Sequence, residues 1–175
     1  MCIRDSPRPP QLSFDTLNRS DDDAGIQRSR GVLSSIIAAE LSSGIPSSRI
    51  ILGGFSQGGA MSLFTGLTQP HRLAGVFGLS CYQLAPAAFD SLSAAAPQAK
   101  DTPVWMGHGD ADPLVRVEWG RATAEGLRER GWDVKWTEYP GVQHSADPDE
   151  LAQLERWVET RLAAGAGSGG QSGGS

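Results

Sequence analysis

The sequence predicts an α/β fold in which a mostly parallel sheet is flanked by helices on both faces. Short apolar runs of the kind that form buried parallel strands alternate along the chain with segments whose apolar residues recur at helical spacing. Such alternation is typical of a parallel sheet covered by helices. The chain has 175 residues, of which 39% are hydrophobic, which suits one packed core rather than two. We therefore expect one folded domain over residues 12–164.

The first predicted helix follows three acidic residues at 21–23, which favour the positive end of a helix dipole. Gly44 and Pro46 are expected to end this helix. Its apolar stripe consists of Ile26, Leu33, Ile36, Ile37 and Leu41. The apolar run 49–55 then predicts a buried parallel strand, and a helix is expected to begin directly after it at Gln57.

Three further strands are predicted at 73–79, 103–108 and 134–139. The stretch 84–98 is rich in Ala and Pro and is interpreted as a surface excursion without assigned structure. The segment 117–130 predicts a helix, which the following glycine ends.

The last predicted helix has Asp147 as its N-cap and Pro148 as its first residue. Its expected buried face consists of Leu151, Leu154, Val158 and Leu162. The Gly/Ser segment 165–175 has no side chains for packing and is predicted to be disordered. Residues 1–11 show no apolar period and are expected to be unstructured.

The charge and cysteine content argues against several classes of protein. The net charge is −5 with both signs interspersed, so no basic surface for nucleic acid is expected. The chain has no polybasic run and no apolar run long enough to span a bilayer, so stable membrane insertion is not expected. The beginning of the chain lacks the apolar stretch of a signal peptide, and Cys2 and Cys81 form no disulfide framework. These features favour the cytoplasm, and lipidation of Cys2 lacks the second signal that anchoring needs.

A G-x-S-x-G motif lies at the junction of the first predicted strand and the helix that follows it. Gly54 and Gly58 flank Ser56, and bulky side chains at these two positions would collide with neighbouring backbone in a sharp strand-to-helix turn. Such a turn lifts the serine hydroxyl above the sheet edge and directs the backbone N–H of Gln57 toward a developing oxyanion. An ordinary turn serine would satisfy the same pattern, but the place of the motif favours a nucleophile.

A serine nucleophile needs a base, and the sequence offers His71, His108 and His144. In this type of site the chain order is serine, then an acid, then histidine. His71 is expected at the surface, and His108 precedes every acid of its loop. His144 lies between the last strand and the last helix, which fits the order, although a solvated loop histidine is the alternative.

The acid that orients the histidine is expected just after the third strand. Asp110 and Asp112 both lie there. Asp110 follows the strand closely, where it could serve only loop N–H groups. The spacing leaves both candidates open.

Three segments together resemble the acyl-protein thioesterase/carboxylesterase family. They are the nucleophile segment 51–63, the acid loop 108–115 and the histidine loop 141–145. The resemblance implies an α/β-hydrolase fold and favours Asp112 over Asp110 as the partner of Ser56 and His144. It also implies a site that needs no metal and no organic cofactor.

The chain departs from the family pattern in two respects. Arg116 stands where the family usually has proline. No L-H-G-x-G-D segment, which supplies a second oxyanion donor in the family, precedes the nucleophile, and Met1 to Ser6 match no family pattern. We therefore expect an N-terminally truncated member that lacks the first strands and the oxyanion loop.

The predicted reaction is acyl transfer through an acyl-Ser56 intermediate. The resemblance implies an acylated protein, a lysophospholipid or a small ester as substrate. The alternatives are a catalytically impaired fragment, a binding module of the same fold, or another small-ester hydrolase such as a lysophospholipase. The glycines do not form a nucleotide-binding fingerprint.

Overall fold

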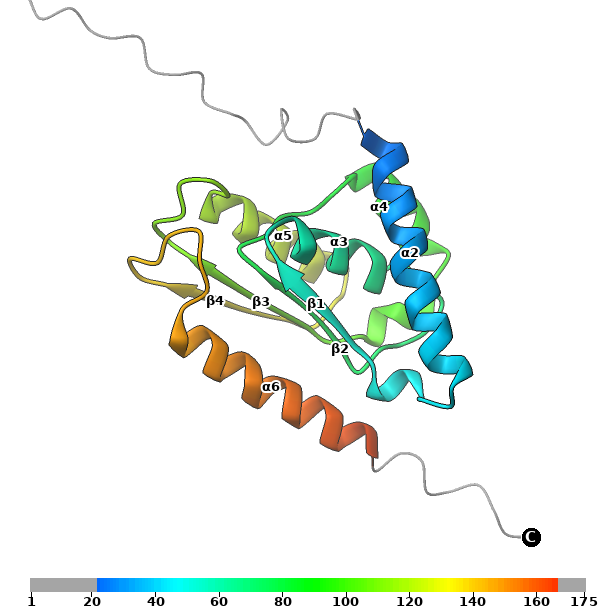
Figure 1. Cartoon of the computed structure of the whole chain (residues 1–175). Coiled ribbons are helices and arrows are strands. Elements are labelled where there is room, and N and C mark those ends of the chain that lie inside the picture. The colour runs from blue at the N-terminus through cyan, green and yellow to red at the C-terminus, as the bar shows by residue number, and fades with distance from the viewer. Residues whose placement is uncertain (1–21, 167–175) are drawn as a thin grey trace, which may run out of the picture.

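The computed structural model describes residues 22–166, and it confirms the predicted α/β architecture (Figure 1). The sheet has four parallel strands in the order β1-β2-β3-β4. Their bounds are β1 Ile51–Phe55, β2 Gly75–Leu79, β3 Val104–Gly109 and β4 Val134–Tyr139. Because the strands are parallel, their carboxyl ends all lie at the same end of the sheet. Binding and catalytic sites of α/β proteins form at this end.

Helices cover both faces of the sheet, as the alternation predicts (Figure 1). One face packs against α3 and α5, with α2 packed on the outside of α3, and the other face packs against α6. The helices are α2 Asp23–Ser42, α3 Gln57–Gly66, α4 Pro86–Ala94, α5 Val117–Glu129 and α6 Pro148–Ala166, with short 3-10 turns at η2 Ser47–Arg49 and η3 Pro97–Asp101. The segment 84–98, interpreted as a surface excursion without assigned structure, contains the helix α4. Phe89 of this helix is buried in the larger core cluster.

Successive side chains of a strand pack into the cores on opposite faces of the sheet. In β3, Val104 and Met106 point into the cluster beneath α3 and α5, whereas Trp105 points to the α6 side. There it packs in one cluster with Tyr139 and Trp157. A sheet with two buried faces thus uses every side chain of its central strands.

Several predicted exposures are wrong. The strand 49–55 was expected to be buried, but β1 is only partly buried because no strand among the described residues pairs with its outer edge. Leu151 belongs to the predicted buried face of α6 but is 48% exposed, and Ile36 of the predicted apolar stripe of α2 is 54% exposed. On α6, Trp157 and the carboxyl group of Glu150 are buried instead, because the helix is rotated relative to the predicted stripe.

The predicted helix starts agree with the structure. The Oδ1 atom of Asp22 accepts a hydrogen bond from the Gly25 N–H at 2.9 Å and caps α2. Asp147 Oδ1 accepts from the Asp149 N–H at 2.8 Å, as expected of an N-cap. The helix α6 continues to Ala166, two residues into the segment predicted to be disordered, and the remaining tail and residues 1–11 lie outside the described residues. None of the helices within 22–166 combines the length and the apolar character that a membrane span requires.

Candidate active site

The three residues predicted to carry the chemistry come together at the carboxyl ends of the strands. Ser56 follows β1, Asp112 lies in the loop after β3, and His144 lies in the loop after β4. The residues are far apart in the sequence, and parallel strands bring their loops to the same edge. The imidazole of His144 contacts both other side chains.

Ser56 occupies a strained turn between β1 and α3. Its backbone has φ +54° and ψ −125°, a region that non-glycine residues rarely adopt and that costs on the order of 1–3 kcal/mol. The Ser56 N–H donates to the Leu79 carbonyl at 2.8 Å, and its own carbonyl accepts from the Ala60 N–H at 3.0 Å. These bonds hold the turn in place. The next N–H, that of Gln57, opens α3, where no intrahelical acceptor can reach it.

The glycines around the turn differ in how much space a Cβ atom would have. A Cβ atom on Gly54 would lie 2.7 Å from the backbone of Gly58, and one on Gly59 would lie 2.7 Å from the Gly54 carbonyl oxygen. A Cβ atom on Gly58 would meet nothing within 4 Å. The prediction of crowding is therefore right for Gly54 and wrong for Gly58, because the first turn of α3 directs Gly59 toward β1.

His144 has the geometry of a base that is oriented by a carboxylate. Its Nδ1 atom lies 2.7 Å from Asp112 Oδ2, and its Nε2 atom lies 3.0 Å from Ser56 Oγ. A carboxylate can only accept, so Nδ1 carries the proton and the Nε2 lone pair faces the serine hydroxyl. The ring of Phe55 packs against the imidazole with 4.7 Å between ring centroids.

The two candidate acids have different partners. Asp112 has a fully buried side chain, and its Oδ1 accepts from the N–H groups of Leu114 and Val115, both at 2.9 Å, so that Oδ2 is left facing His144. Asp110 is exposed and accepts from the Gly141 N–H at 2.6 Å, which ties the acid loop to the histidine loop. The structure thus brings Asp112, and not Asp110, to His144.

The other two histidines do not contact Ser56. His71 is exposed at the surface, as predicted. His108 is fully buried, and its Nε2 atom lies 2.8 Å from the Val115 carbonyl oxygen. Burial lowers the pKa of His108. The sequence reasoning missed both His108 and Phe55 as neighbours of the site, since their contacts depend on loops that meet only in the folded chain.

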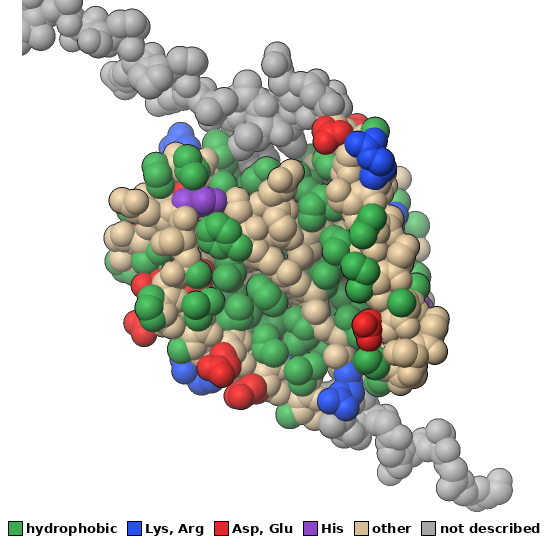
Figure 2. Space-filling model, viewed as in Figure 1, with side chains coloured by type: hydrophobic (Ala, Val, Ile, Leu, Met, Phe, Trp, Pro, Cys, Tyr) green, Lys and Arg blue, Asp and Glu red, His purple; other side chains and the backbone are tan. Residues whose placement is uncertain are grey.

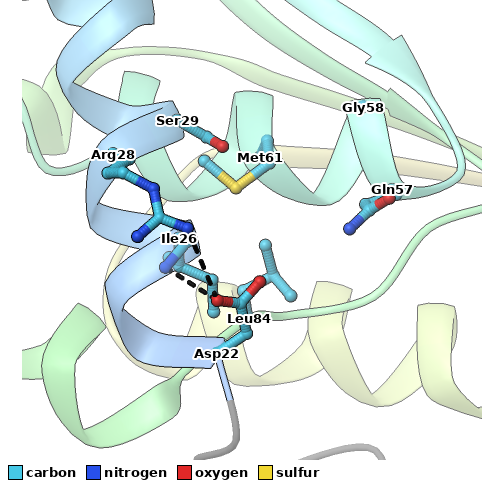
Figure 3. A pocket seen from close by; sticks show the side chains of 9 residues that line it. Asp22, Ile26, Arg28, Ser29, Gln57, Gly58, Met61 and Leu84 are labelled. Atoms are coloured by element: carbon cyan, nitrogen blue, oxygen red, sulfur yellow. Dashed lines mark hydrogen bonds and ion pairs between the residues drawn. The ribbon is translucent and has the colours of Figure 1, made fainter.

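An open cavity of about 550 Å³ lies beside the start of α3 (Figure 3). Ile26, Met61 and Leu84 give it an apolar wall, and Gln57 lies next to Ser56 on its other side. Arg28 contributes a cation that is 76% exposed and stands 4.0 Å from Asp22. The cavity can receive a group that is partly apolar and adjoins the serine turn.

Within residues 22–166, no cluster of three or more His, Cys, Asp or Glu side chains is suited to hold a metal ion. The contacts of Ser56, His144 and Asp112 have the geometry that a nucleophile, a base and an orienting acid require.

The model of one protein family, described as phospholipase/carboxylesterase, matches residues 11–162 of the chain. The chain is also similar to acyl-protein thioesterase 1 of Neurospora crassa, with 46% identity over 150 residues that cover 86% of this chain and 61% of that protein. It is 44% identical over 148 residues to acyl-protein thioesterase 1 of Gibberella zeae, covering 85% and 63% of the two chains. The chain thus spans less than two thirds of the length of these curated relatives.

Among solved structures, the fold is similar to that of SOBER1 from Arabidopsis thaliana, with a TM-score of 0.76 and 31% identity over 81% of this chain and 66% of that one. It is also similar to esterase PE8, with a TM-score of 0.71 and 28% identity over 79% and 63% of the two chains.

Proposed function

The chain belongs to the phospholipase/carboxylesterase family of α/β-hydrolases, and from this premise we propose that it is a serine hydrolase with Ser56, His144 and Asp112 as its catalytic residues. The observation that carries the proposal is the continuous hydrogen-bonded path from Ser56 Oγ through the His144 ring to Asp112 Oδ2, with steps of 3.0 and 2.7 Å. This path supplies what a serine hydroxyl lacks in water, namely a base fixed within reach of its proton.

In the proposed reaction, Ser56 Oγ attacks the substrate carbonyl carbon while His144 Nε2 takes the hydroxyl proton. The tetrahedral intermediate then collapses, the bond to the leaving group breaks, and the imidazolium gives its proton to the leaving sulfur or oxygen. In the second half, water attacks the acyl-Ser56 ester while His144 takes its proton, the bond between the acyl carbon and Oγ breaks, the carboxylic acid leaves, and His144 returns the proton to Ser56 Oγ. Asp112 holds the tautomer and stabilises the imidazolium through Oδ2 in both halves.

The Gln57 N–H is the proposed oxyanion donor. Gln57 is the first residue of α3, directly after Ser56, so its N–H lies at the positive end of the helix dipole, where no intrahelical acceptor can reach it. One such donor is worth about 2.7–4 kcal/mol of transition-state stabilisation.

Acyl thioesters on proteins are the substrate class that we propose. The curated relatives described above carry the name acyl-protein thioesterase 1. A thiolate is a better leaving group than an alkoxide, because the pKa of its conjugate acid is about 8.5. The apolar wall of the cavity beside Gln57 suits part of an acyl substrate. Carboxylic esters, including lysophospholipids, are the second candidate, supported by the family description, since they pass through the same acyl-serine intermediate.

The test is labelling of the purified chain with a fluorophosphonate probe, which reacts with activated serines. We expect labelling of the wild type and of His71→Ala, whose histidine is exposed and away from the site. We expect no labelling of Ser56→Ala or His144→Ala. Hydrolysis of a palmitoyl thioester and of the matching oxygen ester then ranks the substrate classes. A folded wild-type chain that fails to label would show that the site in this chain is impaired.

A further inference from the structure

His108 is a buried titratable residue that the proposed mechanism does not use. It lies near the end of β3, four residues before Asp112, and its side chain is fully buried. Its Nε2 atom faces the Val115 carbonyl oxygen at 2.8 Å and Asp112 Oδ2 at 3.5 Å. The imidazole therefore touches both the far end of the acid loop and the carboxylate oxygen that His144 uses.

The partners of His108 settle which ring nitrogen carries the proton. A carbonyl oxygen can only accept a hydrogen bond, so Nε2 bears the hydrogen. The Nδ1 atom is buried and has no hydrogen-bond partner among the described residues. It faces Gly120 of α5, where any Cβ atom would collide with it, and the ring packs against Trp136 with 5.9 Å between centroids. The cavity for this ring therefore depends on a glycine.

We propose that His108 is a positioning residue for Asp112, and this inference rests on the proposed function of the triad. The Nε2–H group holds the ends of the loop 108–115 together through the Val115 carbonyl. The same Nε2 atom lies 3.5 Å from Asp112 Oδ2, a close contact but not a hydrogen bond, while His144 donates to that oxygen at 2.7 Å. Val115, whose carbonyl His108 holds, donates its own N–H to Oδ1 together with the N–H of Leu114, so the loop that His108 fixes restricts the rotation of the carboxylate.

A role in packing alone does not explain why a polar ring is buried at position 108. A buried imidazole with one unpartnered nitrogen costs free energy that an apolar side chain of similar volume would not. The other charged group near the ring is Glu138 of β4, which is paired with Arg121 of α5 at 2.8 and 2.9 Å. The Nε2–H is thus directed to the acid loop and not to this ion pair.

Two amide substitutions that differ by one methylene group test the proposal. His108→Gln can place an N–H close to the position of Nε2, whereas the shorter His108→Asn cannot reach Val115. The first measurement is the low-field proton NMR signal of the His144 Nδ1–H, which reports its bond to Asp112 and needs no enzymatic activity. The second is the rate of fluorophosphonate labelling. Amide fingerprint spectra check that each variant is folded.

We expect the His144 signal to be retained in His108→Gln and to shift or broaden in His108→Asn, with a loss of about tenfold in labelling rate for the asparagine variant alone. A folded His108→Asn protein with an unchanged signal and rate would overturn the proposal. Should that variant not fold, a His108→Gln protein that is folded but has lost the signal would overturn it as well. If the wild type does not label, but its signal is present and responds to His108→Asn, the proposed function fails and the positioning role stands.

Discussion

Asp110 and Asp112 lie in the same loop, but their side chains point to different partners. They are two residues apart in one loop, and both are hydrogen-bonded carboxylates. Backbone N–H groups occupy one oxygen of Asp112 and leave the other facing His144, whereas Asp110 faces Gly141. The first arrangement orients the imidazole of His144, and the second joins two loops.

Asp112→Asn and Asp110→Asn form a matched pair of variants. We expect Asp112→Asn to lower the fluorophosphonate labelling rate by roughly 10³–10⁴-fold, because an amide favours the wrong tautomer of His144. Asp110→Asn keeps the oxygen that accepts from the Gly141 N–H, so its rate is expected to change less than about threefold. Equal losses in the two variants would contradict the assignment of Asp112.

The strand-turn-helix unit around Ser56 depends on close packing of α3 against β1. Gly54 and Gly59 face one another, and an added Cβ on either would press into backbone rather than into a movable side chain. Backbone cannot move away without displacing the strand or the helix, so this contact also sets the position of Ser56.

Gly59→Ala is expected to destabilise the chain by about 1–3 kcal/mol, the usual cost of overpacking. Gly58→Ala has open space and should be neutral or stabilise α3 by up to about 1 kcal/mol, because alanine favours helix. Urea unfolding followed by circular dichroism measures both. A Gly58→Ala variant that is the less stable of the two would contradict the steric account.

The start of α6 carries a buried acid three residues after its N-cap. Glu150 Oε2 accepts from the Asp147 N–H at 3.2 Å, which completes a capping box, while its Oε1 is buried without a partner among the described residues. Burial, with a further contribution from the charge of Asp147, raises the pKa of Glu150 above its ordinary value. The folded chain therefore binds a proton at Glu150 more tightly than the unfolded chain does.

Because the pKa of Glu150 is raised in the folded chain, this group stabilises the fold fully at a pH below its ordinary pKa of 4.5. That contribution to the free energy of unfolding is lost as the pH rises through the pKa of the folded state. Glu150→Gln keeps an acceptor for the Asp147 N–H and removes the charge. We expect its Tm to exceed that of the wild type by more at pH 8 than at pH 4.5. Glu155→Gln, an exposed change on the same helix, is the control. A difference in Tm that is the same at both pH values would refute this account.

The molecule as a whole presents an extended apolar surface. Figure 2 shows apolar side chains gathered between α6 and α2, over the sheet face that α6 covers only in part. Phe55 is 37% exposed, and Val32 and Ile36 of α2 are 61% and 54% exposed. Among the described residues the outer edge of β1 is unpaired and carries neither lysine nor proline, the residues that commonly protect an edge strand.

We expect this 175-residue chain to associate with itself at micromolar concentration through that surface. Val32→Glu combined with Ile36→Lys should shift the sedimentation coefficient toward that of the monomer. Leu114→Glu changes a residue that is 68% exposed in the acid loop and serves as the control. If the wild type remains monomeric across the concentration range, or if both variants act alike, α2 is not part of the associating surface.

The sequence alone determined the order and type of the strands and main helices, together with the strand-turn-helix place of Ser56. It could do so because apolar periodicity, caps and turns are local properties of the chain. It favoured His144 as the base by chain order and left Asp110 and Asp112 open until a family resemblance favoured one of them.

Tertiary structure decided the remainder. It decided that Gly59 and not Gly58 is crowded, that Ile36 and Leu151 face outward, and that His108 lies against Asp112. Each of these depends on how a helix is rotated against the sheet or on how a loop closes. Helix rotation and loop closure are fixed by contacts between segments distant in the chain, which no local pattern encodes.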